Sequence, residues 1–160
     1  MTNLRAPMLS AAFAVLLCSA CNFQSSPAEG LRFAAPPGWK PSPGILGFMQ
    51  FWRSPNGDDE LLMLFKSPQK LTAKDIFSNP QLHDELQGES IERREPIKIC
   101  GGQTATYVEG RGTTRGRPSQ VSIVLTDVAG TSYLAVYARP VTVSPNPAAL
   151  AALREVCPKL

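Results

Sequence analysis

The chain has 160 residues, which is a typical length for one domain. Its composition is that of an ordinary globular protein, apart from a high count of 15 prolines. Of its 16 lysines and arginines, Arg5 lies in the first twenty residues, so the rest of the chain has 15 basic and 13 acidic side chains. This small positive balance argues against nucleic acid as a partner, because domains that bind nucleic acids usually carry a strongly basic surface.

The first twenty residues have the pattern of an export signal. Arg5 is their only charge, and residues 8–17 are almost entirely apolar. An apolar run of about ten residues is too short to cross a hydrocarbon core, which needs about twenty. The small side chains of Ser19 and Ala20 follow. Because a short basic region, a short apolar run and small residues together are typical of a signal peptide, we expect residues 1–20 to be removed on export.

Cys21 follows Ser19 and Ala20, and this sequence resembles the lipobox of bacterial lipoproteins, whose usual form is Leu, a small residue, Ala or Gly, then Cys. The resemblance implies that the signal is cleaved before Cys21 and that the thiol of Cys21 carries a diacylglycerol, which anchors the protein in a membrane. Cys18 stands where the lipobox usually has Leu. A signal that is cleaved without lipidation and an uncleaved anchor are the two alternatives.

Residues 22–30 are small and polar and include a Pro and a Gly, so they predict a flexible tether between the lipid and the domain. Such a segment reaches at most about 30 Å when extended and about 16 Å as a coil. Asn22 follows Cys21, in place of the Asp that is typical of retention in the inner membrane. In a cell with two membranes, the resemblance to sorted lipoproteins therefore implies an anchor in the outer membrane, with the domain on its periplasmic side.

The domain is expected to begin with a strand and a hairpin. Residues 31–34 form a short strand, and residues 36–39 turn the chain. Two apolar, aromatic-rich runs, 46–53 and 60–66, then flank a turn that contains Asn-Gly. Asn-Gly between two such runs is a strong signal for a β-hairpin. Because both runs are almost continuously apolar, we expect part of this hairpin to be covered on both faces.

The middle of the chain predicts a helix. It begins in residues 71–77, where Thr72 and Asp75 have the spacing of a capping box. Residues 81–87 are expected to add a further turn or two, and Gly88 is well placed to end the helix.

Four strands of a meander follow. Residues 97–100 and 103–110 are joined by a Gly-Gly pair, which favours a two-residue hairpin turn. Residues 121–127 and 132–139 complete the meander, and their apolar side chains alternate between two faces. One face is expected to take Val121, Ile123 and Leu125; in the last strand, Tyr133, Ala135 and Tyr137 oppose Leu134, Val136 and Ala138.

The chain is expected to end in a helix over residues 148–157, capped by Ser144 or Asn146, with Pro147 in its first turn. Strand, hairpin, helix, meander and helix together predict one α+β domain over residues 31–160. Its antiparallel sheet has about six to seven strands, and the mid-chain helix and the C-terminal helix pack on it.

The start of the domain resembles the PsbP family of photosystem extrinsic proteins and their relatives. These domains commonly open with an aromatic strand followed by Pro-x-Gly-Trp, and here Phe33 precedes Pro36-Pro37-Gly38-Trp39. The resemblance would span residues 31–157. It implies a fold only, because one fold serves many functions, and no site residue is carried over from it.

Cys100 and Cys157 are the two cysteines that remain after the signal and the lipid have taken the others. A pair of cysteines in an exported domain normally forms a disulfide, because the compartment is oxidising. Leu150, Leu153 and Cys157 lie at helical spacing on one face, which would press Cys157 against the sheet. We therefore predict a disulfide between these cysteines; two buried free thiols are the alternative.

Three arginines, Arg111, Arg115 and Arg117, and three glycines are concentrated in residues 110–117. Glycine leaves backbone amides accessible, and guanidinium groups bind phosphate or carboxylate oxygens with two parallel hydrogen bonds. The segment is therefore a candidate site for anions such as lipid headgroups or another envelope polyanion. A flexible, solvated loop is the alternative.

The remaining candidates point to ordinary structure. His83 is the only histidine and lies beside two acids, as expected for a solvated side chain, and motifs of nucleophilic catalysis, zinc sites and nucleotide loops are missing. The acids of residues 56–60 lack the alternate spacing of a calcium loop. Four aromatic side chains could line an apolar pocket, although such runs more often form core: Trp39, Phe48, Phe51 and Trp52. No metal or cofactor is predicted.

These observations favour a non-enzymatic, membrane-tethered envelope lipoprotein that binds another envelope component or helps to assemble it. Its expected partners are the membrane, through the lipid, and an envelope protein or anionic envelope component. A small-ligand or polyanion binder that uses the segment Arg111–Arg117 is the first alternative, and an enzyme is the second.

Overall fold

The computed structural model describes residues 31–42, 49–57, 59–72, 74–75, 87–114 and 116–158. These ranges hold a sheet of seven strands, a sheet of two short strands and one α-helix. None of the helices in them is long and apolar enough to cross a membrane. The predicted signal peptide, Cys21 and the predicted tether lie outside the described residues.

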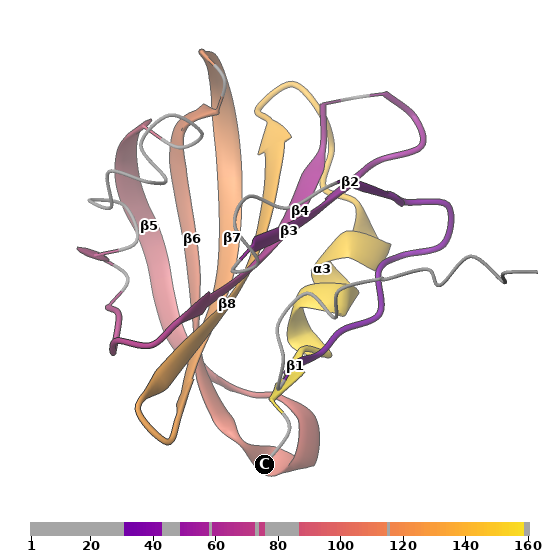
Figure 1. Cartoon of the computed structure of the whole chain (residues 1–160). Coiled ribbons are helices and arrows are strands. Elements are labelled where there is room, and N and C mark those ends of the chain that lie inside the picture. Colours follow the sequence, from indigo (N-terminus) through magenta and orange to yellow (C-terminus); the bar gives the residue numbers. More distant parts are fainter. Residues whose placement is uncertain are drawn as a thin grey trace, which may run out of the picture.

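The seven-stranded sheet is antiparallel at every pairing and follows the order β2-β3-β4-β8-β7-β6-β5 (Figure 1). The antiparallel sheet with a helix on it agrees with the prediction. The sheet has seven strands, as expected, but the predicted first strand, residues 31–34, lies in the two-stranded sheet as β1 (Leu31–Arg32), and β2 was not predicted. From β5 to β8 the chain runs as a meander, and β8 then pairs with β4. In chain order the strands are β2 (Lys40–Ser42), β3 (Met49–Arg53), β4 (Leu61–Ser67), β5 (Gln87–Lys98), β6 (Thr104–Thr114), β7 (Arg117–Val128) and β8 (Thr131–Pro140).

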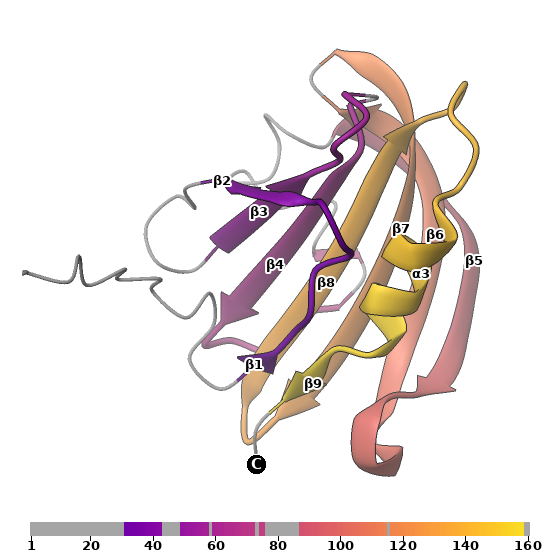
Figure 2. The same cartoon turned by 90° about the vertical axis from the view of Figure 1, so that its right-hand side faces the viewer.

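Both faces of the central strands are buried. The helix α3 (Pro147–Arg154) packs on one of them, which we call the helix face (Figure 2). Val124 and Tyr137 lie on the helix face, whereas Val121 and Ala138 lie on the opposite face. The predicted alternation of β7 and β8 is therefore confirmed, and so is the prediction that the β3–β4 hairpin is covered on both sides. The helix-face core includes Trp52, Leu62, Leu64, Tyr107, Val124, Ala135, Tyr137 and Leu153; the opposite-face core includes Phe51, Leu61, Met63, Val108, Val121, Ile123, Leu134 and Ala138.

The two predicted glycine turns form hairpins. Gly57 has φ of 71° in the β3–β4 connection, where the amide of Ser54 donates to the carbonyl of Glu60 at 3.3 Å. Gly101 and Gly102 have φ of 63° and 78° between β5 and β6. Positive φ at both central residues is the geometry that a tight hairpin turn requires and that glycine adopts without strain.

The middle of the chain differs from the prediction. The capping box is present, because the amide of Thr72 donates to Asp75 Oδ2 at 2.7 Å and the amide of Asp75 donates to Thr72 Oγ1 at 3.3 Å. Lys74 and Asp75 are helical, and the rest of the predicted helix, residues 76–86, lies outside the described residues. Its expected end is wrong, because β5 already begins at Gln87. The described residues hold one complete α-helix where two were expected.

The C-terminal helix begins as predicted and ends earlier. The Asn146 side chain accepts hydrogen bonds from the amides of Ala148 at 3.0 Å and Ala149 at 3.3 Å, so Asn146 rather than Ser144 is the cap. The helix α3 ends at Arg154, with Glu155 as its C-cap. The expectation that the helix continues to Cys157 is therefore wrong.

Cys157 instead lies in β9 (Cys157–Pro158), which pairs antiparallel with β1 (Leu31–Arg32). A disulfide joins Cys100 to Cys157, with their Cα atoms 5.3 Å apart, so the predicted bridge is confirmed. The Arg32 guanidinium also contacts Cys157 Sγ at 3.1 Å. The first strand of the domain, its last strand and the β5–β6 turn are thus held together at one end of the molecule, which we call the β1–β9 pole (Figure 2).

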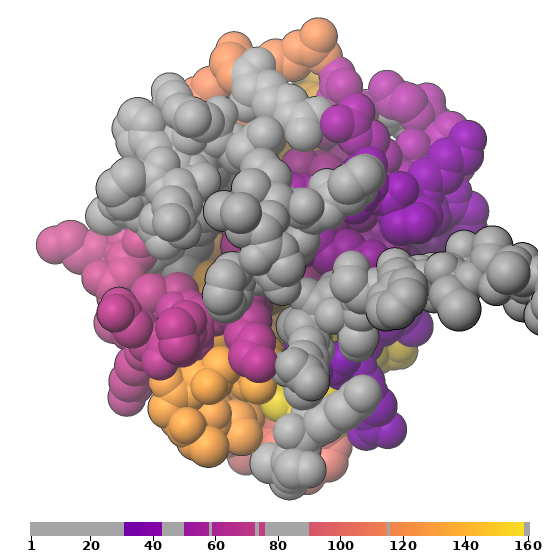
Figure 3. Space-filling view, viewed as in Figure 1, coloured from indigo at the N-terminus to yellow at the C-terminus, as the bar shows by residue number. Residues whose placement is uncertain are grey.

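The other end of the sheet, which we call the hairpin pole, carries the β3–β4 and β6–β7 turns and the end of β8. The space-filling view shows the turn of β6 and β7 at the top and the turn of β7 and β8 at the bottom (Figure 3). The ten residues of β8 run from one pole to the other. Because a strand rises about 3.3 Å per residue, the two poles are about 30 Å apart.

Candidate functional site

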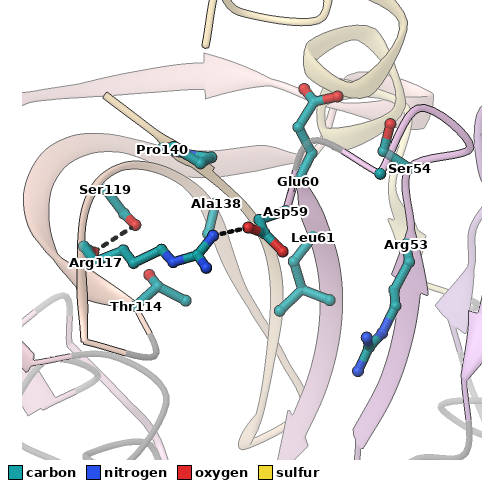
Figure 4. A pocket seen from close by; sticks show the side chains of 11 residues that line it. Arg53, Ser54, Asp59, Glu60, Leu61, Thr114, Arg117, Ser119, Ala138 and Pro140 are labelled. Carbon is teal, nitrogen blue, oxygen red and sulfur yellow. Dashed lines mark hydrogen bonds and ion pairs between the residues drawn. The ribbon is translucent and has the colours of Figure 1, made fainter. Parts of the chain in front are cut away.

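A hollow of about 330 Å³ lies at the hairpin pole (Figure 4). A second hollow, of about 400 Å³, shares four of its lining residues and continues along the residues that follow β8. Both volumes lie in the range of small-ligand sites, about 300–1,000 Å³. The first hollow is lined by Arg53, Ser54, Gly57, Asp59, Glu60, Leu61, Thr114, Arg117, Ser119, Ala138 and Pro140.

The strand alternation explains why these side chains meet. Leu61 and Ala138 are opposed in the register of β4 and β8, and both belong to the opposite-face core. Side chains two residues apart on a strand share a face, so Ser119 and Arg117 lie on the same face as Val121. The first hollow is therefore the polar rim of the opposite face, where its apolar core ends at the hairpin pole.

An ion pair between Arg117 and Asp59 bridges the two hairpins at this rim (Figure 4). Arg117 begins β7, whereas Asp59 lies in the turn before β4 and has φ of 55°. The two side chains are 68% and 56% exposed, so solvent screens the pair. The pair fixes how the turns lie at the mouth of the hollow while leaving most of the guanidinium accessible.

Thr114 lies at the wall of the hollow and is opposed to Arg117 in the register of β6 and β7. The residue is 9% exposed, and its hydroxyl has no hydrogen-bond partner among the described residues. A buried polar group without a partner destabilises the fold, by about 1–3 kcal/mol. Such groups in native proteins often mark the place of a bound water, ion or ligand.

Glu60 closes the back of the hollow and faces the other way (Figure 4). It is 4% exposed, and its carboxylate accepts a hydrogen bond from the hydroxyl of Tyr137 on the helix face. The Tyr137 hydroxyl in turn accepts from the amide of Asn146 at 3.0 Å. Burial, and then the hydrogen bond to Glu60, raise the pKa of Tyr137 well above its usual value. This network ties β4, β8 and the cap of α3 together.

Replacing Tyr137 with phenylalanine is expected to lower the free energy of unfolding by about 1–3 kcal/mol, because the buried Glu60 carboxylate and the Asn146 amide both lose their partner. Urea unfolding measures this change. Tyr133→Phe is the matched control, since Tyr133 is also buried on the helix face and its hydroxyl has no hydrogen bond to the described residues. The control is expected to change stability by less than about 0.5 kcal/mol. Equal effects of the two variants would contradict the role of the network.

The structure does not bring the three predicted arginines into one site. Arg111 lies on β6 on the helix-face side, where it pairs with Glu92 at 2.8 Å, whereas Arg117 lies on the opposite face. Arg115 lies outside the described residues. The connection is also shorter than expected, because β6 extends to Thr114 and β7 begins at Arg117. Arg111 and Arg117 each have their own carboxylate partner, Glu92 and Asp59.

The other candidates are also separated. Trp39 and Trp52 belong to the helix-face core and Phe51 to the opposite-face core, so the three side chains lie on two different faces of the sheet; Phe48 and His83 lie outside the described residues. Within the described ranges, no group of three His, Cys, Asp or Glu side chains could hold a metal ion.

The sequence did not indicate that Arg53, Thr114 and Ser119 line the hollow. It also did not indicate that Glu60 is the hydrogen-bond partner of Tyr137. A local signal exists for some of them, because residues 117, 119 and 121 alternate onto one face with the predicted core. No local signal shows that Arg53 and Asp59 lie opposite Arg117, because their placement depends on β8 pairing with β4, a contact between distant parts of the chain.

Comparisons with known proteins bear on the fold alone. No model of a known protein family matches the sequence, and no curated protein matches it. A crystal structure of a protein from Bacteroides thetaiotaomicron is similar over 82% of this chain, with a TM-score of 0.54 and 10% identity, and the chain spans 46% of that protein.

Two further solved structures are more distant. A Pseudomonas aeruginosa protein of unknown function matches 62% of the chain and 83% of its own length, with a TM-score of 0.43 and 14% identity. The solution structure of CyanoP, the cyanobacterial PsbP protein of Synechocystis, matches 70% of the chain and 75% of its own length, with a TM-score of 0.47 and 18% identity. Likenesses at this level carry no argument about function.

Proposed function

We propose that the protein is a non-enzymatic envelope lipoprotein, tethered to a membrane through Cys21, whose hairpin pole binds another component of the envelope. The observation that carries this proposal is that the start of the domain and the hollow lie at opposite poles of the molecule. The predicted tether leads directly into β1, and β1 lies at the pole opposite the hollow. A tether at the β1–β9 pole leaves the hairpin pole free to face away from the membrane.

The disulfide supports the exported address. A bond between Cys100 and Cys157 forms and persists in oxidising compartments and is rare in the cytosol of most organisms. Added to the predicted tether of at most about 30 Å, the length of the domain places the hairpin pole up to about 60 Å from the anchoring membrane. The partner therefore need not lie in the anchoring membrane itself.

Photo-crosslinking in intact cells tests the proposal. A photoreactive side chain at Thr142, an exposed residue that lines the second hollow, is expected to yield a crosslinked product. Thr104 is the matched control, because it is exposed as well and begins β6 near the β1–β9 pole. The Thr104 position is expected to yield little or no product. Crosslinking at Thr104 alone would contradict the proposed binding surface.

A small-ligand binder is the second candidate function, and the hollow favours it. The alternative based on a joint site of the three arginines loses support, because Arg111 and Arg117 project from different faces of the sheet. The volume and the charged lining of the hollow instead suit a compact ligand at Arg117.

A further inference from the structure

We propose that the hollow at the hairpin pole binds a small oxyanion, a carboxylate or phosphate group, on the guanidinium of Arg117, and that Asp59 holds this guanidinium when no ligand is bound. This inference rests on the proposed function, because it names the chemistry that the hairpin pole recognises. It is carried by the charges of the lining, by the incomplete pairing of Arg117 and by the unpartnered hydroxyl of Thr114.

Among the described residues that line the hollow, cationic side chains outweigh the carboxylates that are not engaged elsewhere. Its lining includes two guanidinium groups, Arg53 and Arg117, and two carboxylates, Asp59 and Glu60. Glu60 points away, toward the helix face, where Tyr137 donates to it (Figure 4). Asp59 is therefore the carboxylate that remains to balance two cations, and Arg53 has no ion-pair partner among the described residues. An anionic group complements this lining.

The Arg117 guanidinium has N–H donors that its ion pair with Asp59 does not use. A guanidinium carries five N–H donors, and the ion pair with Asp59 uses one nitrogen and one carboxylate oxygen. Phosphate and carboxylate groups can accept two parallel hydrogen bonds from one guanidinium, which is the stronger arrangement. A ligand that binds in this way replaces the solvent-screened ion pair between Arg117 and Asp59, which has one contact, by a pair with two hydrogen bonds. Asp59 thus acts as a resident carboxylate that a ligand must displace.

Thr114 supplies the second contact. Its Cα is paired with that of Arg117 across the β6–β7 turn, and the two side chains lie on the same face. Its hydroxyl is buried at the wall of the hollow without a partner in the described part of the chain, so it can donate to an oxyanion held by Arg117. Binding would remove the cost of that unsatisfied group, and this cost is the reason to expect a ligand there.

The test is a titration of the purified full-length protein with inorganic phosphate, followed by the NMR shifts of backbone amides. The amides of Thr114, Arg117 and Asp59 are expected to shift together. Asp59→Asn is expected to bind phosphate about five-fold more tightly, because an exposed ion pair contributes up to about 1 kcal/mol and its loss frees the guanidinium. Asparagine also tolerates the positive φ of residue 59.

Arg117→Gln is expected to weaken phosphate binding at least about ten-fold, because a hydrogen bond to a charged group contributes about 1.5–3 kcal/mol. Arg111→Gln is the matched control, since Arg111 is an exposed arginine of the same hairpin that is also paired with a carboxylate. The control is expected to bind phosphate as the unchanged protein does. Equal losses in the two variants would show general attraction by positive charge and would overturn the proposal.

The Thr114→Val variant distinguishes a loss of phosphate binding from a loss of stability. The variant is expected to bind phosphate several-fold more weakly while unfolding at the same or a higher urea concentration, because it removes an unsatisfied buried hydroxyl. Weaker folding without any change in binding would overturn the role of Thr114. Unchanged or weaker binding by Asp59→Asn would overturn the role of Asp59.

The source of the oxyanion is settled by a second arm with the Cys21→Ser variant, which lacks the lipid. Binding to phosphatidylglycerol vesicles that requires Arg117 identifies a lipid headgroup, and binding of free phosphate alone identifies a soluble ligand. Failure of both arms overturns this inference. The proposed function still stands in that case if Thr142 crosslinks to a partner, and it falls by itself if phosphate binds but no crosslink forms.

Discussion

The double variant Cys100→Ala, Cys157→Ala is expected to lower the free energy of unfolding by about 4 kcal/mol. The disulfide closes a loop of 57 residues. A cross-link across such a loop lowers the conformational entropy of the unfolded chain, and this loss corresponds to about 4 kcal/mol. Alanine avoids placing a polar atom at Cys157, which is 6% exposed. Urea unfolding followed by tryptophan fluorescence measures the change, because Trp39 and Trp52 are both buried.

Reduction provides the control for this variant. A reducing agent is expected to destabilise the unchanged protein by a similar amount and to leave the double variant unaffected. Mass mapping of the unreduced protein is expected to find Cys100 and Cys157 in one linked peptide. Two alkylatable thiols in the native protein, or a loss of stability below about 1 kcal/mol, would contradict a bridge that constrains the unfolded chain.

The parts of the fold that local patterns determine could be predicted from the sequence. A strand places alternate side chains on opposite faces, so the two cores of β7 and β8 could be assigned residue by residue. The glycine turns at Gly57 and Gly101 require positive φ, which few other residues adopt without cost. The cap of the last helix could be narrowed to Ser144 or Asn146, because both side chains can accept hydrogen bonds from free backbone amides; Asn146 is the residue that does so.

The bridge could be predicted for a different reason. Once Cys18 and Cys21 are assigned to the signal and the lipid, Cys100 and Cys157 are the remaining pair. The geometry behind the prediction was nevertheless wrong, because Cys157 reaches Cys100 from β9 and not from the helix. The assignment was correct because it depended on the number of cysteines and the compartment, and not on the end of α3.

Most of the strand β5 could not be recognised, because residues 87–96 lack the apolar pattern of a strand; only its last two residues fall in the predicted strand 97–100. It is the edge strand of the sheet and pairs only with β6, and its described side chains are mostly exposed and charged. Charged side chains protect an edge from pairing with other chains, so such a strand looks like a loop in sequence. Gly110 on β6 is indirect evidence of a strand beside it, because a Cβ at this position would lie 2.6 Å from the carbonyl oxygen of Ser90 in β5.

The hollow could not be predicted because three separate segments form it, residues 53–61, 114–119 and 138–140. Arg117 and Thr114 are neighbours across one turn, but Arg53 and Asp59 come from another hairpin that reaches them through β4 and β8. The pairing of β4 with β8 joins residues more than sixty positions apart. Local propensity carries no information on such a pairing. The arginine-rich segment therefore looks like one site in the sequence, whereas its described arginines lie on two faces of the sheet.

Cys21→Ser is expected to move the whole protein from the membrane fraction to the soluble fraction and to abolish palmitate labelling. None of the helices in the described residues is long and apolar enough to cross a membrane. A single acyl chain gives only marginal membrane binding, whereas several chains on one residue hold a protein stably, so loss of the lipid is expected to release it completely. Fractionation of cells that express the variant measures this result.

Cys18 supplies the matched control for that experiment. Cys18→Ser is expected to leave both labelling and membrane association in place, because Leu17 is too bulky to precede a cleaved cysteine at position 18. Cys18→Leu restores the usual lipobox and is expected to be processed at least as completely as the natural chain. If Cys18→Ser releases the protein and Cys21→Ser does not, the anchor lies at the other cysteine. If Cys21→Ser stays in the membrane without any lipid, the segment 1–20 is an uncleaved anchor and the tether proposed here does not exist.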